Sequence, residues 1–395
     1  MAQVITGLEN CLESPPKVLR DAARFGLLAN QASVNKDFEY ASTLLARRFP
    51  GKLAALFSPQ HGFWGEQQEN MIETGHSRDS LLGVPVFSLY SETRKPTPAM
   101  LEGLECLVVD LQDVGTRIYT FVWTMMACLE ACASAKIPVL VLDRPNPLGG
   151  DAFEGPLLDL HYASFVGRSA IPMRHGLTMG ELAHWLNAEH KIGADLHVVK
   201  MSGWLRGMLW PESGRTWVIT SPNLPRPEGC LVYPGQVLLE GTNVSEGRGT
   251  TTPFEVLGAP FVSPSKLLDE LSAYKLTGLH LRPVRFVPTF HKWRDKSCGG
   301  LYLHVTDPRI FQPVRTTLAL ITTIRRLWPS EFAWRDPPYE YETVKKPIDI
   351  LFCNCMFREA LEKNPVKTPA ELDELLFLDR AAWRKRVSEH LLYGG

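Results

Sequence analysis

The amino-acid sequence predicts an α/β protein, with a doubly wound parallel sheet followed by a second, smaller α/β domain at the C-terminal end. Three observations support this fold class. Short apolar runs alternate with helical segments through the first two-thirds of the chain, each run ends in a polar cluster, and the pattern changes after residue 258. Continuous apolar runs between helices are typical of a parallel sheet that is covered on both faces.

The first domain is expected to alternate strands and helices. The expected strands are 25–29, 53–57, 106–110, 137–142, 196–199 and 217–220. The expected helices are 37–48, 98–103, 121–136 and 178–189. Pro98 suits the first turn of its helix, and the spacing of Thr178 and Glu181 is that of a capping box. This order of elements predicts a sheet wound from both sides.

The smaller domain begins after residue 258 in this interpretation. Ser263 and Pro264 predict the start of a helix that reaches about residue 274. Strands are expected at 280–287 and 301–306, and helices at 313–328 and 368–393. We expect this domain to pack on the first and to form one wall of a crevice.

Polar residues follow five of the apolar runs. Asn30 and Gln31 come after the first run, and the other clusters are 58–61, 110–113, 143–146 and 221–223. In open parallel sheets, ligands bind beyond the carboxyl ends of the strands. We therefore expect these clusters to form a binding site at one edge of the sheet.

The segment 239–253 is the second candidate for this site. It combines Glu240, Asn243, Glu246 and Arg248 with several hydroxyl residues and three glycines. Such a segment cannot bury an apolar face, and its glycines allow the backbone to approach a ligand closely. We interpret it as a loop that binds a hydroxyl-rich or anionic ligand.

Composition restricts the partners. The chain has 395 residues, of which 45% are hydrophobic and 22% charged, as in soluble globular proteins. A net charge of −1 gives no electrostatic reason to expect binding to nucleic acid or to a membrane surface. The N-terminal residues do not resemble a secretory signal, and eight cysteines are too few for a disulfide framework. We expect a cytoplasmic location, and the sequence leaves the oligomeric state open.

Several enzyme classes are disfavoured. The segment 29–34 has no glycine fingerprint for a dinucleotide, and the chain has neither a phosphate-binding P-loop nor a Gly-x-Ser-x-Gly elbow. His61 and His175 lack the spacing of a recognised metal motif. We therefore expect no cofactor and no metal, and a metal-dependent hydrolase of another bond stays an alternative.

Carboxylates and arginines gather in the predicted site. The carboxylates are Glu66, Asp110, Asp113, Asp143, Glu240 and Glu246, and the arginines are Arg117, Arg144, Arg174 and Arg248. Glycoside hydrolysis commonly uses two carboxyl groups across the scissile bond. An arginine can bind both oxygens of a substrate carboxylate in one plane. The aromatic residues Phe63, Trp64, Tyr90 and Tyr119 are of the kind that stacks on sugar rings. The residues thus favour a site for an acidic sugar.

Seven ordered motifs resemble those of the NamZ-type exo-β-N-acetylmuramidases. They are 86–90 with 95–97, 109–120, 141–147, 164–167, 174–178, 221–223 and 240–250. The resemblance implies a Rossmann-like catalytic domain, here 1–258, and an auxiliary C-terminal domain, here 259–395. It also implies removal of terminal N-acetylmuramic acid from peptidoglycan fragments, with the cleft between the domains.

Gln60 departs from the family pattern. The usual Pro-Glu-His-Gly is here Pro-Gln-His-Gly, so that Gln60 stands in place of the glutamate regarded as catalytic. An amide has no proton to give and is a far weaker base than a carboxylate. Three interpretations stay open: Glu66 takes over the role, the chemistry uses Glu92, Asp113 or Glu246, or the chain binds sugar without cutting it.

The resemblance and the residues together give expected roles. Glu66 is the expected general acid or base, with His61 as its neighbour and Asp113 or Glu246 as the second carboxylate. Arg144 or Arg248 would bind the lactyl carboxylate, and Asn146, Asn223 and Asn243 the hydroxyl or acetamido groups. The other expected binding residues are Asn30, Gln112, Arg117, Tyr119, Asp143, Arg174, His175, Glu240 and Thr242.

Overall fold

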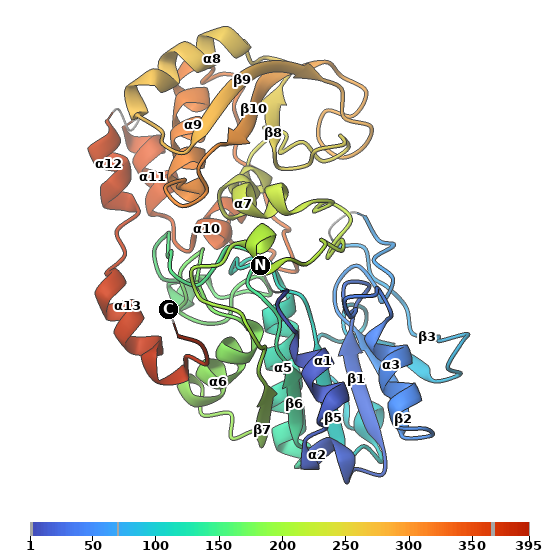
Figure 1. Ribbon diagram of the computed structural model, residues 1–395. Helices are drawn as coiled ribbons and strands as arrows, with labels where there is room; N and C mark the ends of the chain where they lie inside the picture. Colours follow the sequence, from blue (N-terminus) through green and yellow to red (C-terminus); the bar gives the residue numbers. More distant parts are fainter. Residues whose placement is uncertain (1–2, 69–70, 365–367, 395) are drawn as a thin grey trace.

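A seven-stranded sheet forms the centre of the first domain in the computed structural model, which describes residues 3–68, 71–364 and 368–394 (Figure 1). The strand order is β3-β4-β2-β1-β5-β6-β7. The bounds are β1 Phe25–Ala29, β2 Leu53–Ser58, β3 Ser77–Arg78, β4 Pro85–Ser88, β5 Cys106–Asp110, β6 Val139–Leu142 and β7 Leu196–Val199. All neighbours pair in parallel except β3, which is antiparallel to β4 at the edge. The predicted doubly wound α/β fold is confirmed, and its sheet contains two strands that were not predicted, the parallel strand β4 and the antiparallel edge strand β3.

Helices cover both faces of this sheet. The helices of the first domain are α1 Gly7–Glu13, α2 Lys17–Arg20, α3 Ala41–Arg48, α4 Pro98–Leu101, α5 Phe121–Ala135 and α6 Met179–Glu189. The first three pack into one apolar core and the last three into another. Successive strand residues point to opposite faces, so that Leu27 enters one core and Leu28 the other. The continuous apolar runs of the sequence thus reflect burial on both sides.

Residues 37–40 do not belong to a helix, contrary to the prediction. Val34 and Tyr40 form an isolated antiparallel bridge, and Phe38 has a φ of 63°. A positive φ is incompatible with a right-handed helix. The helix α3 therefore begins at Ala41, at the end of a turn.

Residues 217–220 do not form a strand, and this prediction was wrong. The carbonyl oxygen of Thr220 accepts hydrogen bonds from the side-chain amides of Asn30 and Gln31, each at 3.1 Å. Because Asn30 follows directly after β1, the segment reaches the carboxyl end of that central strand rather than pairing beside β7. The segment crosses the edge of the sheet, and the indole N–H of Trp217 donates a hydrogen bond to the carbonyl of Leu224.

The second domain is built around a three-stranded antiparallel sheet of order β8-β10-β9. The strands are β8 Val256–Ala259, β9 Leu279–Phe286 and β10 Cys298–Val305. The helices are α7 Pro227–Gln236, α8 Pro264–Leu271, α9 Pro313–Leu327, α10 Pro347–Phe352, α11 Met356–Lys363, α12 Pro369–Leu375 and α13 Arg380–Val387. The smaller α/β domain is confirmed. We describe α7 and β8 with it because β8 pairs with β10 and Gln236 of α7 bonds Thr317 of α9, although both elements begin before residue 258. The division after residue 258 stays a prediction.

The single helix expected at 368–393 is divided. Asp379 lies between α12 and α13, and its carboxylate accepts a hydrogen bond from the backbone N–H of Ala382 at 2.9 Å. Such N-caps begin a new helix. The chain then turns so that α13 lies beside α6 of the first domain (Figure 1), where the rings of Trp185 and Trp383 are 5.6 Å apart.

The C-terminal tail also anchors a buried carboxylate of the first domain. The hydroxyl of Tyr393 donates to Asp143 at 2.6 Å, beside donors from Thr178 and Gly180. Burial raises the pKa of Asp143 to about 6 in spite of these bonds.

Tyr393→Phe should therefore lower the free energy of unfolding by roughly 1.5–3 kcal/mol at pH 8, the usual range for a hydrogen bond to a charged group. The loss should shrink below about pH 6, where Asp143 takes up a proton. Urea unfolding at both pH values measures it, with the half-exposed Tyr40→Phe as the control. A loss that is the same for both variants would mean that the tail does not stabilise Asp143.

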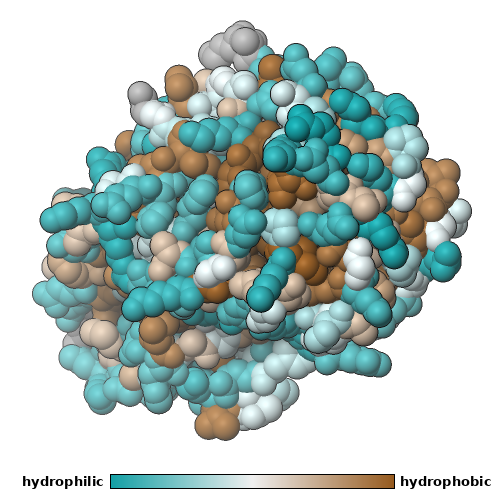
Figure 2. Space-filling view, turned by 90° about the horizontal axis from the view of Figure 1, so that it is seen from below, coloured by the Kyte–Doolittle hydropathy of each residue, from teal (hydrophilic) through white to brown (hydrophobic). Residues whose placement is uncertain are grey.

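Hydrophobic and hydrophilic side chains both reach the surface. In Figure 2, hydrophobic side chains lie in small groups between hydrophilic ones on the face shown. Among the described residues, no helix combines the length and the hydrophobicity needed to cross a bilayer.

Candidate active site

A deep recess lies where loops at the carboxyl edge of the large sheet meet the second domain. About 420 Å³ between its walls is free of protein atoms, a figure that includes solvent on its open side. Fourteen residues line it, and all of them are buried. They are Gln60, His61, Ile118, Tyr119, Thr120, Phe121, Val166, Ser221, Tyr233, Glu240, Arg248, Phe254, Tyr339 and Glu340. We call this space the central recess.

Gln60 lies at the centre of a hydrogen-bond network in the central recess. Its carbonyl oxygen accepts a bond from the hydroxyl of Thr120 at 2.7 Å. Its amide nitrogen therefore faces the other way, 3.3 Å from Oε1 of Glu340 and 3.1 Å from the hydroxyl of Tyr90. Tyr90 in turn donates to Oε2 of Glu340 at 2.8 Å. The amide that replaces the usual glutamate thus donates to a carboxyl group from a distant part of the chain.

Glu340 is the important residue that sequence analysis missed. Only 2% of its surface is exposed. Burial raises its pKa to about 7, the negative charge of Glu240 adds to this, and the hydrogen bonds from Tyr90 and Gln60 oppose it. A carboxyl group with such a pKa is partly protonated at neutral pH, which is the property of a general acid.

A strained turn holds Glu340 in place. Tyr339 and Glu342 exchange both backbone hydrogen bonds at 2.9 Å, and the two residues between them have φ values of 43° and 69°. Glycine or asparagine normally occupies such positions, and other residues cost on the order of 1–3 kcal/mol each. The turn persists because it is fixed at both ends: the Tyr339 hydroxyl donates to Glu240 at 2.7 Å, and the guanidinium of Arg94 lies 3.7 Å from the ring of Tyr341. Strain of this kind concentrates at functional sites.

His61 contributes a neutral imidazole to the central recess. Its Nδ1 lies 2.7 Å from the carbonyl oxygen of Gln67, so Nδ1 carries the proton and Nε2 is left as an acceptor. Burial lowers its pKa to about 4. His61 can therefore accept a hydrogen bond from a ligand hydroxyl, and it carries no charge at neutral pH.

A charged cluster forms the opposite wall. Arg248 donates to Glu240 at 2.7 Å, and its Nε lies 3.3 Å from Glu246. Lys292 also donates to Glu246, at 2.8 Å. Burial by itself would raise the pKa of Glu246, but the cations around it, Lys292 first, hold it well below its usual range. Glu246 is therefore ionised and held behind Arg248, while Glu240 and Arg248 line the recess.

Five of the residues expected from the sequence line the central recess: Gln60, His61, Tyr119, Glu240 and Arg248. Twelve others do not line it, and each of these forms a hydrogen bond with a backbone group, which lies in the same segment for Asp113, His175 and Thr242 and in another segment for the rest. They are Asn30, Gln112, Asp113, Arg117, Asp143, Arg144, Asn146, Arg174, His175, Asn223, Thr242 and Asn243. In the structure these side chains brace the loops that carry the site.

The alternative catalytic carboxylates also lie away from the central recess. The carboxylate of Glu66 lies against Gly62, and a side-chain carbon placed on that glycine would meet it at 2.8 Å. Glu92 is exposed, and Asp113 accepts a bond from the N–H of Gly115 and lies 3.5 Å from His175. None of the three lines the recess.

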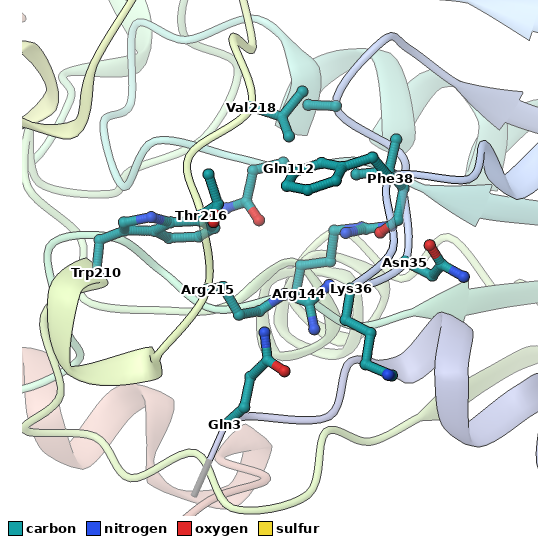
Figure 3. Close-up of a pocket in the computed structure, with 12 residues that line it drawn as sticks. Gln3, Asn35, Lys36, Phe38, Gln112, Arg144, Trp210, Arg215, Thr216 and Val218 are labelled. Carbon is teal, nitrogen blue, oxygen red and sulfur yellow. The ribbon is translucent and has the colours of Figure 1, made fainter. Parts of the chain in front are cut away.

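A second cavity lies at the same edge of the sheet and is lined by residues that include Gln112 and Arg144; about 360 Å³ there, open solvent included, is free of protein atoms. Figure 3 shows Arg144 close to Arg215, with Phe38 and Trp210 on either side. Arg144 pairs with Asp110 and Arg215 pairs with Glu9, and no carboxyl group is among the residues that line this cavity. The central recess presents Glu240 and Glu340 and is therefore the better candidate for catalysis.

No cluster suited to a metal ion was found in the described ranges, where three or more His, Cys, Asp or Glu side chains would have to converge. The chemistry of the central recess is instead that of carboxyl groups, an amide, hydroxyls and one guanidinium.

Comparison with known proteins identifies the family. The model of the N-terminal part of exo-β-N-acetylmuramidase NamZ matches residues 25–228, and the model of its C-terminal part matches residues 231–393. A relative from Bacillus subtilis (strain 168), the peptidoglycan β-N-acetylmuramidase NamZ, is 46% identical over 330 residues, which cover 84% of this chain and 79% of that protein.

Solved structures agree with this result. Two DUF1343 family proteins of Bacteroides fragilis have the same fold over the whole chain. One has a TM-score of 0.88 at 31% identity, with 100% of both chains covered. The other has a TM-score of 0.75 at 28% identity, with 100% of this chain and 99% of that chain covered. The resemblance found in the sequence motifs is confirmed: the chain belongs to the NamZ family of exo-β-N-acetylmuramidases.

Proposed function

We propose that this protein is a glycosidase that releases terminal N-acetylmuramic acid from peptidoglycan fragments. Family membership gives the class of reaction, and the central recess supports it. The observation that carries the proposal is that one buried recess presents two carboxyl groups, Glu240 and Glu340, beside Arg248. Glycoside hydrolysis needs carboxyl groups, and an acidic sugar needs a cation.

The depth of the recess favours action at the end of a glycan. Every lining residue is buried, so the site is a hollow in the protein rather than a groove along its surface. A hollow admits the end of a chain, whereas a groove admits its interior. Arg248 is placed to bind the lactyl carboxylate, which distinguishes N-acetylmuramic acid from N-acetylglucosamine.

Cysteine chemistry supports a cytoplasmic location. All eight cysteines are free, and seven of them are buried thiols. Free thiols persist in reducing compartments. We propose that the protein acts there on imported fragments, and cell fractionation with an antibody would test this.

The activity test uses the disaccharide MurNAc-β-1,4-GlcNAc. We expect the wild-type protein to release free MurNAc, measured by mass spectrometry, and to release far less sugar from GlcNAc-β-1,4-GlcNAc, which lacks the lactyl carboxylate. Equal cleavage of the two disaccharides would contradict the specificity that we assign to Arg248.

Gln60 supports a second candidate function, a sugar-binding protein without hydrolysis. In that case the wild-type protein would bind MurNAc in calorimetry and release none from the disaccharide. Gln60→Glu would then restore release. Turnover by the wild-type protein excludes this candidate.

A further inference from the structure

The central recess contains a carboxyl group that can replace the glutamate missing at position 60. The two carboxyl groups that line the recess differ in their partners. Glu240 accepts bonds from the cation of Arg248 and from the hydroxyl of Tyr339. The hydrogen bonds made by the carboxyl of Glu340 come from neutral groups, the hydroxyl of Tyr90 and the amide of Gln60. A carboxyl among neutral partners is the one that can hold a proton.

The side chain of Glu340 lies next to Gln60, the residue that departs from the family pattern. Oε1 of Glu340 lies 3.3 Å from the amide nitrogen of Gln60. Thr120 fixes the orientation of that amide, because its hydroxyl donates to the amide oxygen at 2.7 Å. The nitrogen of Gln60 therefore faces Glu340, and the two side chains occupy adjoining places on one wall.

We propose that Glu340 is the general acid of this chain and that Gln60 is a positioning residue which orients its carboxyl group. The assignment rests on the glycosidase function proposed above. As the bond between C1 of the sugar and the glycosidic oxygen breaks, the carboxyl proton of Glu340 passes to that oxygen. A water molecule adds its hydroxyl to C1, and the proton that it loses restores the carboxyl group of Glu340 directly or through solvent.

The electrostatics of the recess fit this role. Burial raises the pKa of Glu340 to about 7, so that a large share of the molecules carry the proton near neutral pH. Activity that depends on this proton must fall as the pH rises through about 7. The strained turn from Tyr339 to Glu342 keeps the carboxyl group in the recess.

Glu340→Gln tests the assignment with two substrates. The disaccharide has a poor leaving group that needs a proton, whereas the 4-nitrophenyl β-glycoside of MurNAc has a leaving group that needs none. We expect Glu340→Gln to lower kcat on the disaccharide by about 10²–10⁴-fold, the usual contribution of a general acid, and to lower kcat far less on the nitrophenyl glycoside. For the wild type, the loss of activity above about pH 7 should be present with the disaccharide and absent with the nitrophenyl glycoside.

Glu342→Gln is the matched control. Glu342 lies in the same turn, its carboxylate accepts backbone bonds from Val344 and Lys345, and the amide oxygen of glutamine can accept them too. We expect this variant to keep wild-type activity on both substrates. Circular dichroism and binding of free MurNAc would show that the variants are folded.

The outcomes separate the two proposals. If the wild type cleaves neither substrate, the glycosidase function fails and the assignment of Glu340 fails with it. If the wild type is active and Glu340→Gln cleaves the disaccharide at a similar rate, the assignment alone is wrong. Equal losses on the two substrates would also overturn it, because a general acid is needed for only one of them.

Gln60→Glu gives an independent measurement. It would place a second carboxyl group about 3.3 Å from Glu340, and two carboxyls at this distance share one proton, which is held to higher pH. We expect the alkaline loss of disaccharide activity to move to higher pH in this variant. A loss at an unchanged pH would mean that Glu340 is not the group that titrates.

Discussion

Glu340→Gln should raise the free energy of unfolding by about 3 kcal/mol at pH 8, although it removes a catalytic group. In the unfolded chain this carboxyl ionises near its ordinary value of 4.5, whereas in the folded protein burial raises its pKa to about 7. The proton therefore favours the folded state. Its contribution is fully present below pH 4.5 and is lost as the pH rises through 7, at about 1.4 kcal/mol per pH unit.

The measurement is urea unfolding of the wild type and Glu340→Gln at pH 4.5 and pH 8. The two proteins should differ by less than about 1 kcal/mol at pH 4.5, where Glu340 is protonated in the folded protein and about half protonated in the unfolded chain. Glu342→Gln should behave in the opposite way, because the backbone bond from Val344 lowers the pKa of Glu342 and so stabilises the fold as the pH rises. A Glu340→Gln effect independent of pH would show that the folded protein does not hold this proton.

A stabilising effect of Glu340→Gln at pH 8 would show that the turn carries a second energetic cost besides its strained backbone. Glu340 and Tyr341 both adopt positive φ, and neither is glycine or asparagine. The protein therefore bears two costs at one place, a strained backbone and a buried ionisable group whose hydrogen-bond donors Tyr90 and Gln60 are neutral. Costs of this kind persist where the group is needed for chemistry.

The sequence predicted the large sheet well because its evidence is local. The strands 25–29, 106–110 and 196–199 have the predicted bounds. Each is a short apolar run closed by a polar residue or a turn. Burial on both faces leaves this pattern in β1 and β5, whose residues are all buried. The failure at 217–220 has the same origin, because an apolar run that crosses the edge of a sheet looks like a strand until its partners are known.

The site was predicted less well because its central contacts are not local. Gln60 and Glu340 lie 280 residues apart in the chain and meet only through the packing of the two domains. The turn that presents Glu340 carries no glycine or asparagine, so its residues give no turn signal. Conversely, polar residues after strands, such as Asn30 and Asn146, bond backbone carbonyls instead of lining the recess. The position of these residues after strands predicted that they lie at one edge of the sheet. It did not show which side chains bond the backbone of the loops and which face the recess.

Arg248→Met should lower the free energy of unfolding by about 3–5 kcal/mol at neutral pH, the cost of removing one partner from a buried ion pair. Arg248 is 6% exposed and lies between Glu240 and Glu246, which are both more deeply buried. Methionine fills similar space without a charge, so the carboxylates would lose a cation that nothing replaces. Arg20→Met, which breaks the exposed pair with Asp21, should cost less than about 1 kcal/mol.

The pH dependence of the Arg248→Met effect shows whether the lost stability comes from the charge of Glu246. The cations around Glu246 lower its pKa, so the stability that they supply is present above its ordinary pKa of 4.5 and is lost as the pH falls below it. The cost of Arg248→Met should therefore shrink on acidification, and a cost that stays constant would point to lost packing against Phe254 instead.

Arg248→Lys separates stability from recognition. It keeps the positive charge between the carboxylates but loses the planar fork, so it should recover much of the stability while still losing preference for MurNAc over GlcNAc. If the lysine variant keeps that preference, Arg248 stabilises the wall of the recess and another group reads the lactyl carboxylate.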